Sequence, residues 1–140
     1  MPNTPRNRLG ELERAVMEHL WSTAEAHPDG LTVREVHDEI GVRRGLAYTT
    51  LMTVLDRMAK KDLVSRERDG RAWRYTPAST REELTSESLH HTLGELAGGT
   101  RRSALLHFLD ESTPEELDEL KAALAELEAR RSPGPRPRSA

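Results

Sequence analysis

The chain has 140 residues, of which 35% are hydrophobic, 32% charged and 4% aromatic. This composition predicts one helix-rich domain with a modest core, or such a domain with a smaller helical unit. Cysteine is absent, which excludes disulfides and thiolate metal sites. No apolar run reaches the roughly 20 residues that a membrane span needs, and no secretory signal opens the sequence, so we expect a cytoplasmic protein. The net charge of −3 does not favour nucleic-acid binding, but a total hides how the charges are distributed.

Two helices are predicted in the first third of the chain. The first runs from about Leu9 to Ala26, where apolar residues recur every three or four positions, and the HPDG stretch at 27–30 ends it. Thr32 and Glu35 have the spacing of a capping box, which predicts a short second helix that stops near Gly41.

A third helix and a hairpin follow. The helix lies within 45–61, and strands are expected at 64–68 and 72–76, joined by an Asp69–Gly70 turn. The elements therefore follow in the order helix, helix, turn, helix and hairpin, which is the order of a winged helix-turn-helix. In such a domain the second helix of the helix-turn-helix enters the major groove of DNA.

Three threonines stand in the third helix, although each costs up to about 0.7 kcal/mol relative to Ala. A helical wheel places them with Arg57 and Lys60, opposite an apolar stripe that Ala47 and Tyr48 extend. Short side chains let the backbone approach base edges, and cations reach phosphates, although Asp56 on the same side repels them. An ordinary solvated face is the alternative interpretation. The residues that we expect to contact DNA are Thr49, Thr50, Thr53, Arg57, Lys60, Arg68 and Arg71.

The charges are unevenly distributed along the chain. Residues 43–76 carry nine cations and four acids, a net charge of +5, whereas 78–131 carry six cations and twelve acids, a net charge of −6. Arg68 and Arg71 flank the predicted turn, where a wing would meet the DNA backbone. A local basic patch of this kind is expected of a protein that contacts phosphates.

The last third of the chain predicts three helices. A capping box at Thr80 and Glu83 opens the first, which we expect to end at Gly98–Gly99. A shorter helix is expected around 101–109. Thr113–Glu116 begins the last, whose leucines step by three and four as in a coiled-coil seam.

The predicted fold class is therefore mainly α with a small β-hairpin. We expect a winged helix-turn-helix DNA-binding domain at 8–78, a helical dimerisation region at 79–131 and a disordered tail at 132–140, with the first seven or so residues also disordered. Packing of the C-terminal helices on the winged helix of the same chain is the alternative to dimerisation. The expected dimerisation residues are Leu89, Leu93, Leu96, Leu105, Phe108, Leu117, Leu120, Leu124 and Leu127.

Four motifs together resemble the penicillinase-repressor (BlaI/MecI) family of bacterial regulators: LGELERAVMEHLW, LTVREVHDEI, LAYTTLMTVLDRMAKKDLV and RAWRYTP. The resemblance covers residues 8–128 and implies a homodimeric transcriptional repressor that binds operators with dyad symmetry ahead of β-lactamase and related genes. It places Thr50, Thr53 and Arg57 at recognition-helix positions that the family uses on DNA. Met52 stands where some members carry a longer polar or basic residue, so the base preference does not carry over.

The resemblance also implies a route for ending repression, as part of an antibiotic response. In the family a membrane sensor protease, activated by β-lactam, leads to a cut within the dimerisation region. The segment SALLHFLDE aligns with that cut and places the candidate bond at His107–Phe108. Phe108 as a plain anchor of the dimer core is the alternative interpretation.

Catalytic patterns are missing from the sequence. The six histidines are scattered, with no Ser-His-acid or HExxH pattern, so we expect no enzyme, no metal site and no cofactor. Two other functions stay open: a ligand- or metal-responsive winged-helix regulator, and a winged helix used only to bind protein.

Overall fold

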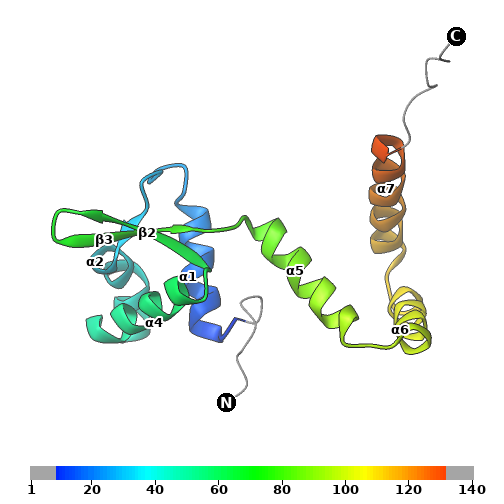
Figure 1. Ribbon diagram of the computed structural model, residues 1–140, viewed down its shortest axis with the longest axis horizontal. Helices are drawn as coiled ribbons and strands as arrows, with labels where there is room; N and C mark the ends of the chain where they lie inside the picture. The colour runs from blue at the N-terminus through cyan, green and yellow to red at the C-terminus, as the bar shows by residue number, and fades with distance from the viewer. Residues whose placement is uncertain (1–8, 132–140) are drawn as a thin grey trace, which may run out of the picture. The chain divides into compact units, whose positions relative to one another are not determined.

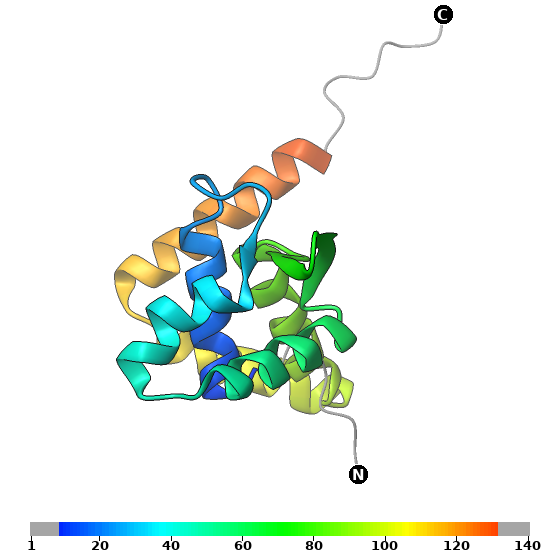
Figure 2. The same cartoon turned by 90° about the vertical axis from the view of Figure 1, so that its left-hand side faces the viewer.

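The computed structural model describes residues 9–131; the disorder expected for the first seven residues and for 132–140 falls outside them. The chain forms two compact units, one reaching to Thr92 and one starting at Leu93. Helices predominate and a small antiparallel sheet accompanies them (Figures 1 and 2), which confirms the predicted fold class. The domain limits 8–78 and 79–131 stay a prediction.

The elements of the first unit follow the order of a winged helix-turn-helix. A helix-turn-helix is formed by the segment from α2 to α3 together with α4, and the wing is the hairpin of β2 and β3. The bounds are α1 Glu11–Ser22, β1 Leu31–Thr32, α2 Val33–Val36, η1 His37–Gly41, α3 Val42–Arg44, α4 Tyr48–Lys60, β2 Val64–Asp69, β3 Ala72–Pro77 and α5 Arg81–Gly94.

The second helical segment continues past the predicted stop at Gly41. It passes through the π-helical turn η1 and ends at Gly45, whose φ of +65° closes the helix in the left-handed conformation that glycine favours. Gly41 has a different role, because a Cβ at this position would collide with the ring of His37. The first helix, by contrast, is shorter than the predicted Leu9–Ala26: it runs from Glu11 to Ser22.

The sheet has a third strand that the sequence did not predict. β1 pairs antiparallel with β3, placing Leu31 opposite Tyr75, and the strand order is β1-β3-β2. In the wing, Asp69 pairs with Ala72, so Gly70 and Arg71 form the turn, one residue later than predicted. Gly70 has φ +62° at the first central position, where type II′ turns take glycine.

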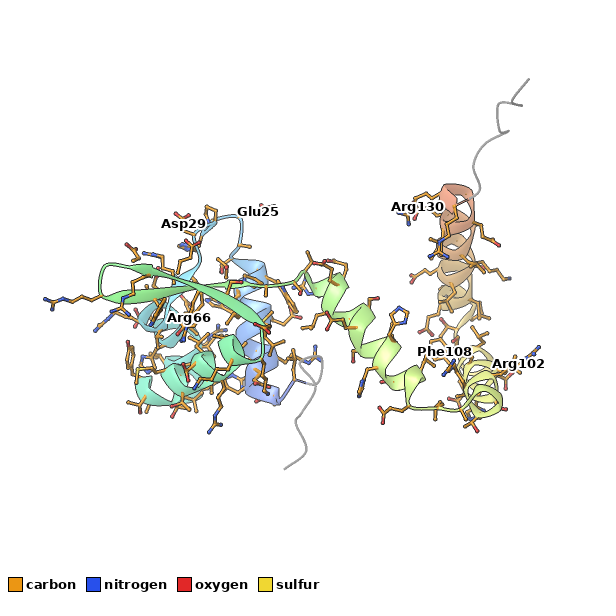
Figure 3. All side chains as sticks on the ribbon, in the orientation of Figure 1. Glu25, Asp29, Arg66, Arg102, Phe108 and Arg130 are labelled. Atoms are coloured by element: carbon orange, nitrogen blue, oxygen red, sulfur yellow. The ribbon has the colours of Figure 1, made fainter. Side chains whose placement is uncertain are left out.

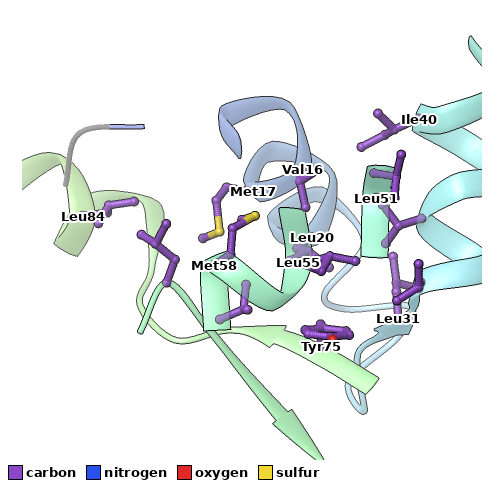
Figure 4. Packing of buried hydrophobic residues seen from close by; sticks show 14 residues of the cluster. Val16, Met17, Leu20, Leu31, Ile40, Leu51, Leu55, Met58, Tyr75 and Leu84 are labelled. Carbon is purple, nitrogen blue, oxygen red and sulfur yellow. The ribbon is translucent and has the colours of Figure 1, made fainter. Parts of the chain in front are cut away.

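The core of the first unit lies between the helices and one face of the sheet (Figure 4). Leu51, Leu55 and Met58 of α4 are completely buried, and this turns the opposite face of α4 outward. Tyr75 of β3 and Leu84 of α5 are also buried, so the core reaches beyond the predicted boundary at 78/79. The buried residues are Val16, Met17, Leu20, Leu31, Val33, Val36, Ile40, Leu51, Leu55, Met58, Leu63, Val64, Tyr75 and Leu84.

The second unit contains α6 (Gly98–Asp110) and α7 (Pro114–Arg131). Gly98–Gly99 open α6, whereas α5 already ends at Gly94, so the predicted helix end was wrong by one short turn. The start of α7 is as predicted: the Thr113 hydroxyl accepts a hydrogen bond from the Glu116 N–H at 3.1 Å. Of the described residues from Leu93 to Arg131, none is buried.

Candidate nucleic-acid interface

The outward face of α4 carries the side chains expected to contact DNA. Thr49, Thr50, Thr53, Arg57 and Lys60 are all exposed. They lie on one side of a helix whose other side supplies the core, so the helical periodicity predicted this face correctly. Their contact with bases or phosphates stays a prediction.

The start of α4 is fixed by the preceding helical segment. The Leu46 carbonyl accepts a hydrogen bond from His37 Nε2 at 2.9 Å, and the Leu46 N–H donates to the Gly41 carbonyl at 2.8 Å. The His37 ring also meets the edge of the Tyr48 ring at 5.9 Å between centroids. Ala47 and Tyr48 are exposed, so the predicted extension of the apolar stripe was wrong.

Asp56 is paired with two cations. Lys60 Nζ and Arg66 Nη1 each lie 3.0 Å from its carboxylate oxygens. Lys60, and next Arg66, lower the pKa of the Asp56 carboxyl below its ordinary value. The two cations therefore offset the repulsion between Asp56 and phosphate. Lys60 in turn has its charge partly neutralised by Asp56.

Other cations of the basic segment are paired with acidic side chains of the winged-helix unit. Arg44 pairs with Glu11 at 2.8 Å, and Lys61 pairs with Glu13 at 2.9 Å. A third cation, Arg74, binds Asp69 at 2.7 Å and also contacts Glu35 and the Gly30 carbonyl. These ion pairs use charges that the sequence count had assigned to the basic patch.

Three arginines of the expected interface are left with their charge available. Among residues 9–131, Arg57, Arg68 and Arg71 form no ion pair. Arg57 lies on α4, and Arg71 lies in the turn of the wing. Within the described part of the chain, ion pairing thus leaves four of the nine cations of residues 43–76 without a carboxylate partner: Arg57 on α4, Arg68 and Arg71 on the wing, and Arg43, which lies on α3 and donates to the Glu39 carbonyl.

The wing also contains an aromatic platform that sequence reasoning missed. The guanidinium centres of Arg66 and Arg68 lie 4.7 Å and 5.0 Å from the ring centroid of Trp73, within the range of cation–π attraction. Arg68 pairs with Trp73 across the hairpin, and Arg66 stands two residues earlier on the same strand face. Hydrogen bonding to Tyr75 is the main cause that raises the pKa of the Arg66 guanidinium above its ordinary value, and hydrogen bonding to Asp56 is the second. The hairpin register would have revealed this cluster.

The expected dimerisation residues are left largely uncovered. Leu89, Leu105, Phe108, Leu120 and Leu124 are between 40% and 61% exposed. The remaining four, Leu93, Leu96, Leu117 and Leu127, are partly exposed. Dimerisation through these side chains stays a prediction.

The candidate cleavage bond, His107–Phe108, lies inside α6. His107 Nε2 is 3.3 Å from a carboxylate oxygen of Glu111, one turn further along the helix. Phe108 is 56% exposed (Figure 3).

Metal binding and membrane spanning find no support in the part of the chain that the structure describes. Histidine and carboxylate side chains do not gather there into a group that could hold a metal ion. None of the described helices is long and apolar enough to cross a membrane.

The order of the elements and the three-stranded sheet define a winged-helix fold, which is a fold of DNA-binding proteins. The penicillinase repressor family matches residues 9–126, and the chain belongs to this family. The chain is 51% identical over 123 residues to the transcriptional regulator BlaI of Mycobacterium tuberculosis (strain ATCC 25618 / H37Rv), covering 87% of this chain and 86% of that relative. It is 27% identical over 126 residues to the penicillinase repressor of Bacillus licheniformis, covering 89% and 94%. The protein is a transcriptional repressor, as its resemblance to this family implied.

Proposed function

We propose that the protein is a homodimeric, cytoplasmic repressor that binds pseudo-palindromic duplex operators through α4 and the wing. The observation that carries this proposal is the outward face of α4, where three threonines stand beside Arg57 and the core residues point away. The wing adds Arg68 and Arg71, whose charges form no ion pair in the described part of the chain.

The two groups of side chains have different chemical uses on DNA. Thr50 and Thr53 present a hydroxyl and a methyl group, which suit base edges and the thymine methyl. Arg57, Arg68 and Arg71 suit phosphates, which supply affinity but no sequence information. The Trp73 ring holds Arg68 in place before DNA arrives, which lowers the ordering cost of binding.

Dimerisation is supported by the exposed apolar side chains of the second unit. Leucines and Phe108 in α6 and α7 are not buried within the chain, and a second copy would remove them from water. A dimer brings two winged helices to half-sites about one helical turn apart, or a near multiple. Simultaneous binding raises affinity through effective concentration.

Release by proteolysis at His107–Phe108 is the mechanism that we propose for induction. A protease needs an extended backbone, so α6 has to open first. None of the described side chains of α6 is buried in the chain, which makes local opening inexpensive. A cut there separates α7 from the winged helix and removes the avidity. The regulated genes we propose are those of β-lactamase or a related stress response, under a membrane sensor protease.

The test begins with a footprint on genomic DNA flanking the gene of this protein, followed by fluorescence anisotropy titrations at several salt concentrations. Thr50→Ala and Thr53→Ala should reduce the preference for the footprinted duplex over a random duplex. Arg68→Gln and Arg71→Gln should weaken both duplexes alike and lower the salt slope by about 1 each. Equal loss on both duplexes in the threonine variants would refute base readout by α4.

A second experiment tests release. Mass spectrometry of the protein from cells before and after β-lactam exposure should show a fragment ending at His107. Full-length protein that persists while the target genes are induced would refute proteolysis and favour dissociation by a ligand.

A further inference from the structure

The connection between the wing and α5 is short, and each of its residues forms a hydrogen bond. Ala78, Ser79 and Thr80 separate β3 from α5. The Ala78 N–H donates to the Leu63 carbonyl at 3.0 Å, and the Ser79 carbonyl accepts from Trp21 Nε1 at 2.9 Å. Thr80 caps α5 by accepting from the Glu83 N–H at 3.0 Å. A stretch that the sequence predicts to be a domain boundary is therefore no flexible linker.

The first turn of α5 is fastened to α1. Arg81 Nη2 lies 2.6 Å from Glu18 Oε2, and its Nε lies 3.3 Å from Glu18 Oε1, a two-point contact. The guanidinium centre of Arg81 also lies 5.1 Å from the ring centroid of Trp21. Leu84, one turn further on, is 4% exposed and belongs to the core.

These contacts act together. An exposed ion pair alone contributes little to stability, since water screens it and two side chains must be ordered. Here the Arg81 guanidinium contacts a carboxylate and an aromatic ring at once, and the same ring donates a hydrogen bond to the connection. The base of α5 is thus fixed in two ways: Glu18 and Trp21 contact it at the protein surface, and its own Leu84 is buried in the core.

We propose that Glu18, Trp21 and Arg81 are positioning residues for operator recognition: they fix the direction in which α5 leaves the winged helix, and thereby set the half-site spacing that the dimer accepts. This inference rests on the proposed dimeric repressor. A loose connection would let each winged helix search many positions, as flexible linkers do. A fixed connection at the base of α5 narrows the range of spacings over which the avidity is realised, because this part of the chain does not have to be ordered when both half-sites bind.

The test uses the full-length protein and a duplex selected by the wild type from a random library. Anisotropy titrations compare that duplex with versions whose half-sites are moved apart in steps up to about half a helical turn (~5 base pairs). A single half-site is titrated in parallel. The wild type should lose about 100-fold in affinity across the series. Arg81→Gln and Glu18→Gln should lose about tenfold at the preferred spacing and vary only about threefold across the series.

Three further variants distinguish an effect on the direction of α5 from a general loss of protein stability. Arg81→Lys, which keeps the charge, should recover more of the spacing preference than Arg81→Gln. Trp21→Phe keeps an aromatic ring but loses the hydrogen bond to Ser79, and should flatten the profile in the same direction. Arg130→Gln removes another exposed ion pair, with Glu126 at the end of α7, and should behave like the wild type.

Single half-site binding by all variants should equal that of the wild type, because the α4 face is unchanged. Wild-type spacing profiles in Arg81→Gln and Glu18→Gln would overturn the inference and leave the proposed function intact. Failure of the wild type to select any duplex with two half-sites would instead refute the proposed function.

Discussion

Replacing Gly30 with Ala tests whether the short strand β1 holds the sheet to the helices. Gly30 has φ +89° and directly precedes β1. A Cβ at this position would collide with the backbone carbonyl of Tyr75 and lie 2.8 Å from Thr76 Cγ2. The Gly30 carbonyl also accepts a hydrogen bond from Arg74 Nη1 at 3.1 Å.

The expected loss in the free energy of unfolding of Gly30→Ala has two parts. The positive φ alone costs Ala about 1 kcal/mol. The collision is with backbone atoms of the central strand β3, so no side-chain rotation relieves it and β1 has to move away. Weakening the two residue pairs between β1 and β3 adds about 2 kcal/mol, for a total of about 3 kcal/mol. Gly70→Ala is the matched control: its φ is +62°, nothing lies within 4 Å of the added Cβ, and about 1 kcal/mol is expected.

Urea unfolding followed by circular dichroism, at a single protein concentration, measures the difference. With a slope of about 1.5 kcal/mol per M, the 2 kcal/mol between the variants separates their midpoints by about 1.3 M. Equal midpoints for Gly30→Ala and Gly70→Ala would show that β1 moves freely, and would refute the reasoning about the sheet.

Three other substitutions test the core, the interface charge and the response to acid. Leu84→Ala should lower the free energy of unfolding by about 3 kcal/mol, because Leu84 is 4% exposed; a loss below about 1 kcal/mol in urea titration would place α5 outside the core. Asp56→Asn releases two cations, so affinity for random duplex DNA should rise about threefold, and an unchanged salt slope in anisotropy titrations would contradict this. The backbone N–H of Thr32 lowers the pKa of Glu35, so the contribution of Glu35 to stability is full above about pH 5 and is lost as the pH falls through the lowered pKa. Glu35→Gln should therefore weaken the acid dependence of the urea midpoint, and identical dependence in both proteins would rule out this role.

Local patterns predicted most helices because their signals lie within a few residues. The Thr32 capping box forms as expected, with hydrogen bonds of 2.9 and 3.2 Å. Strand β1 has only two residues, too few for an alternating pattern, and only its partner β3 defines it. Glycine signals were ambiguous: Gly41 serves packing, and Gly98 opens a helix instead of closing one.

The exposed face of α4 was predictable from helical periodicity, but the distribution of available charge was not. Lys61 binds Glu13 across 48 positions of sequence, and Arg74 reaches Glu35 across 39. No local pattern shows such pairs. The same limit applies to Trp21, whose hydrogen bond to the Ser79 carbonyl joins the end of α1 to the connection before α5 across 58 positions.

Glu13 links two distant helix ends, and this has a consequence for cooperativity. Its Oε1 accepts a hydrogen bond from the Gly10 N–H at 3.0 Å, capping α1, while its Oε2 binds Lys61 at 2.9 Å just after the end of α4. Because one carboxylate serves both ends, fraying of the last turn of α4 removes a partner from the first turn of α1. The two turns therefore open together, as one cooperative unit. A disturbance at the C-terminal end of the DNA-facing helix is thus shared with the helix that anchors α5.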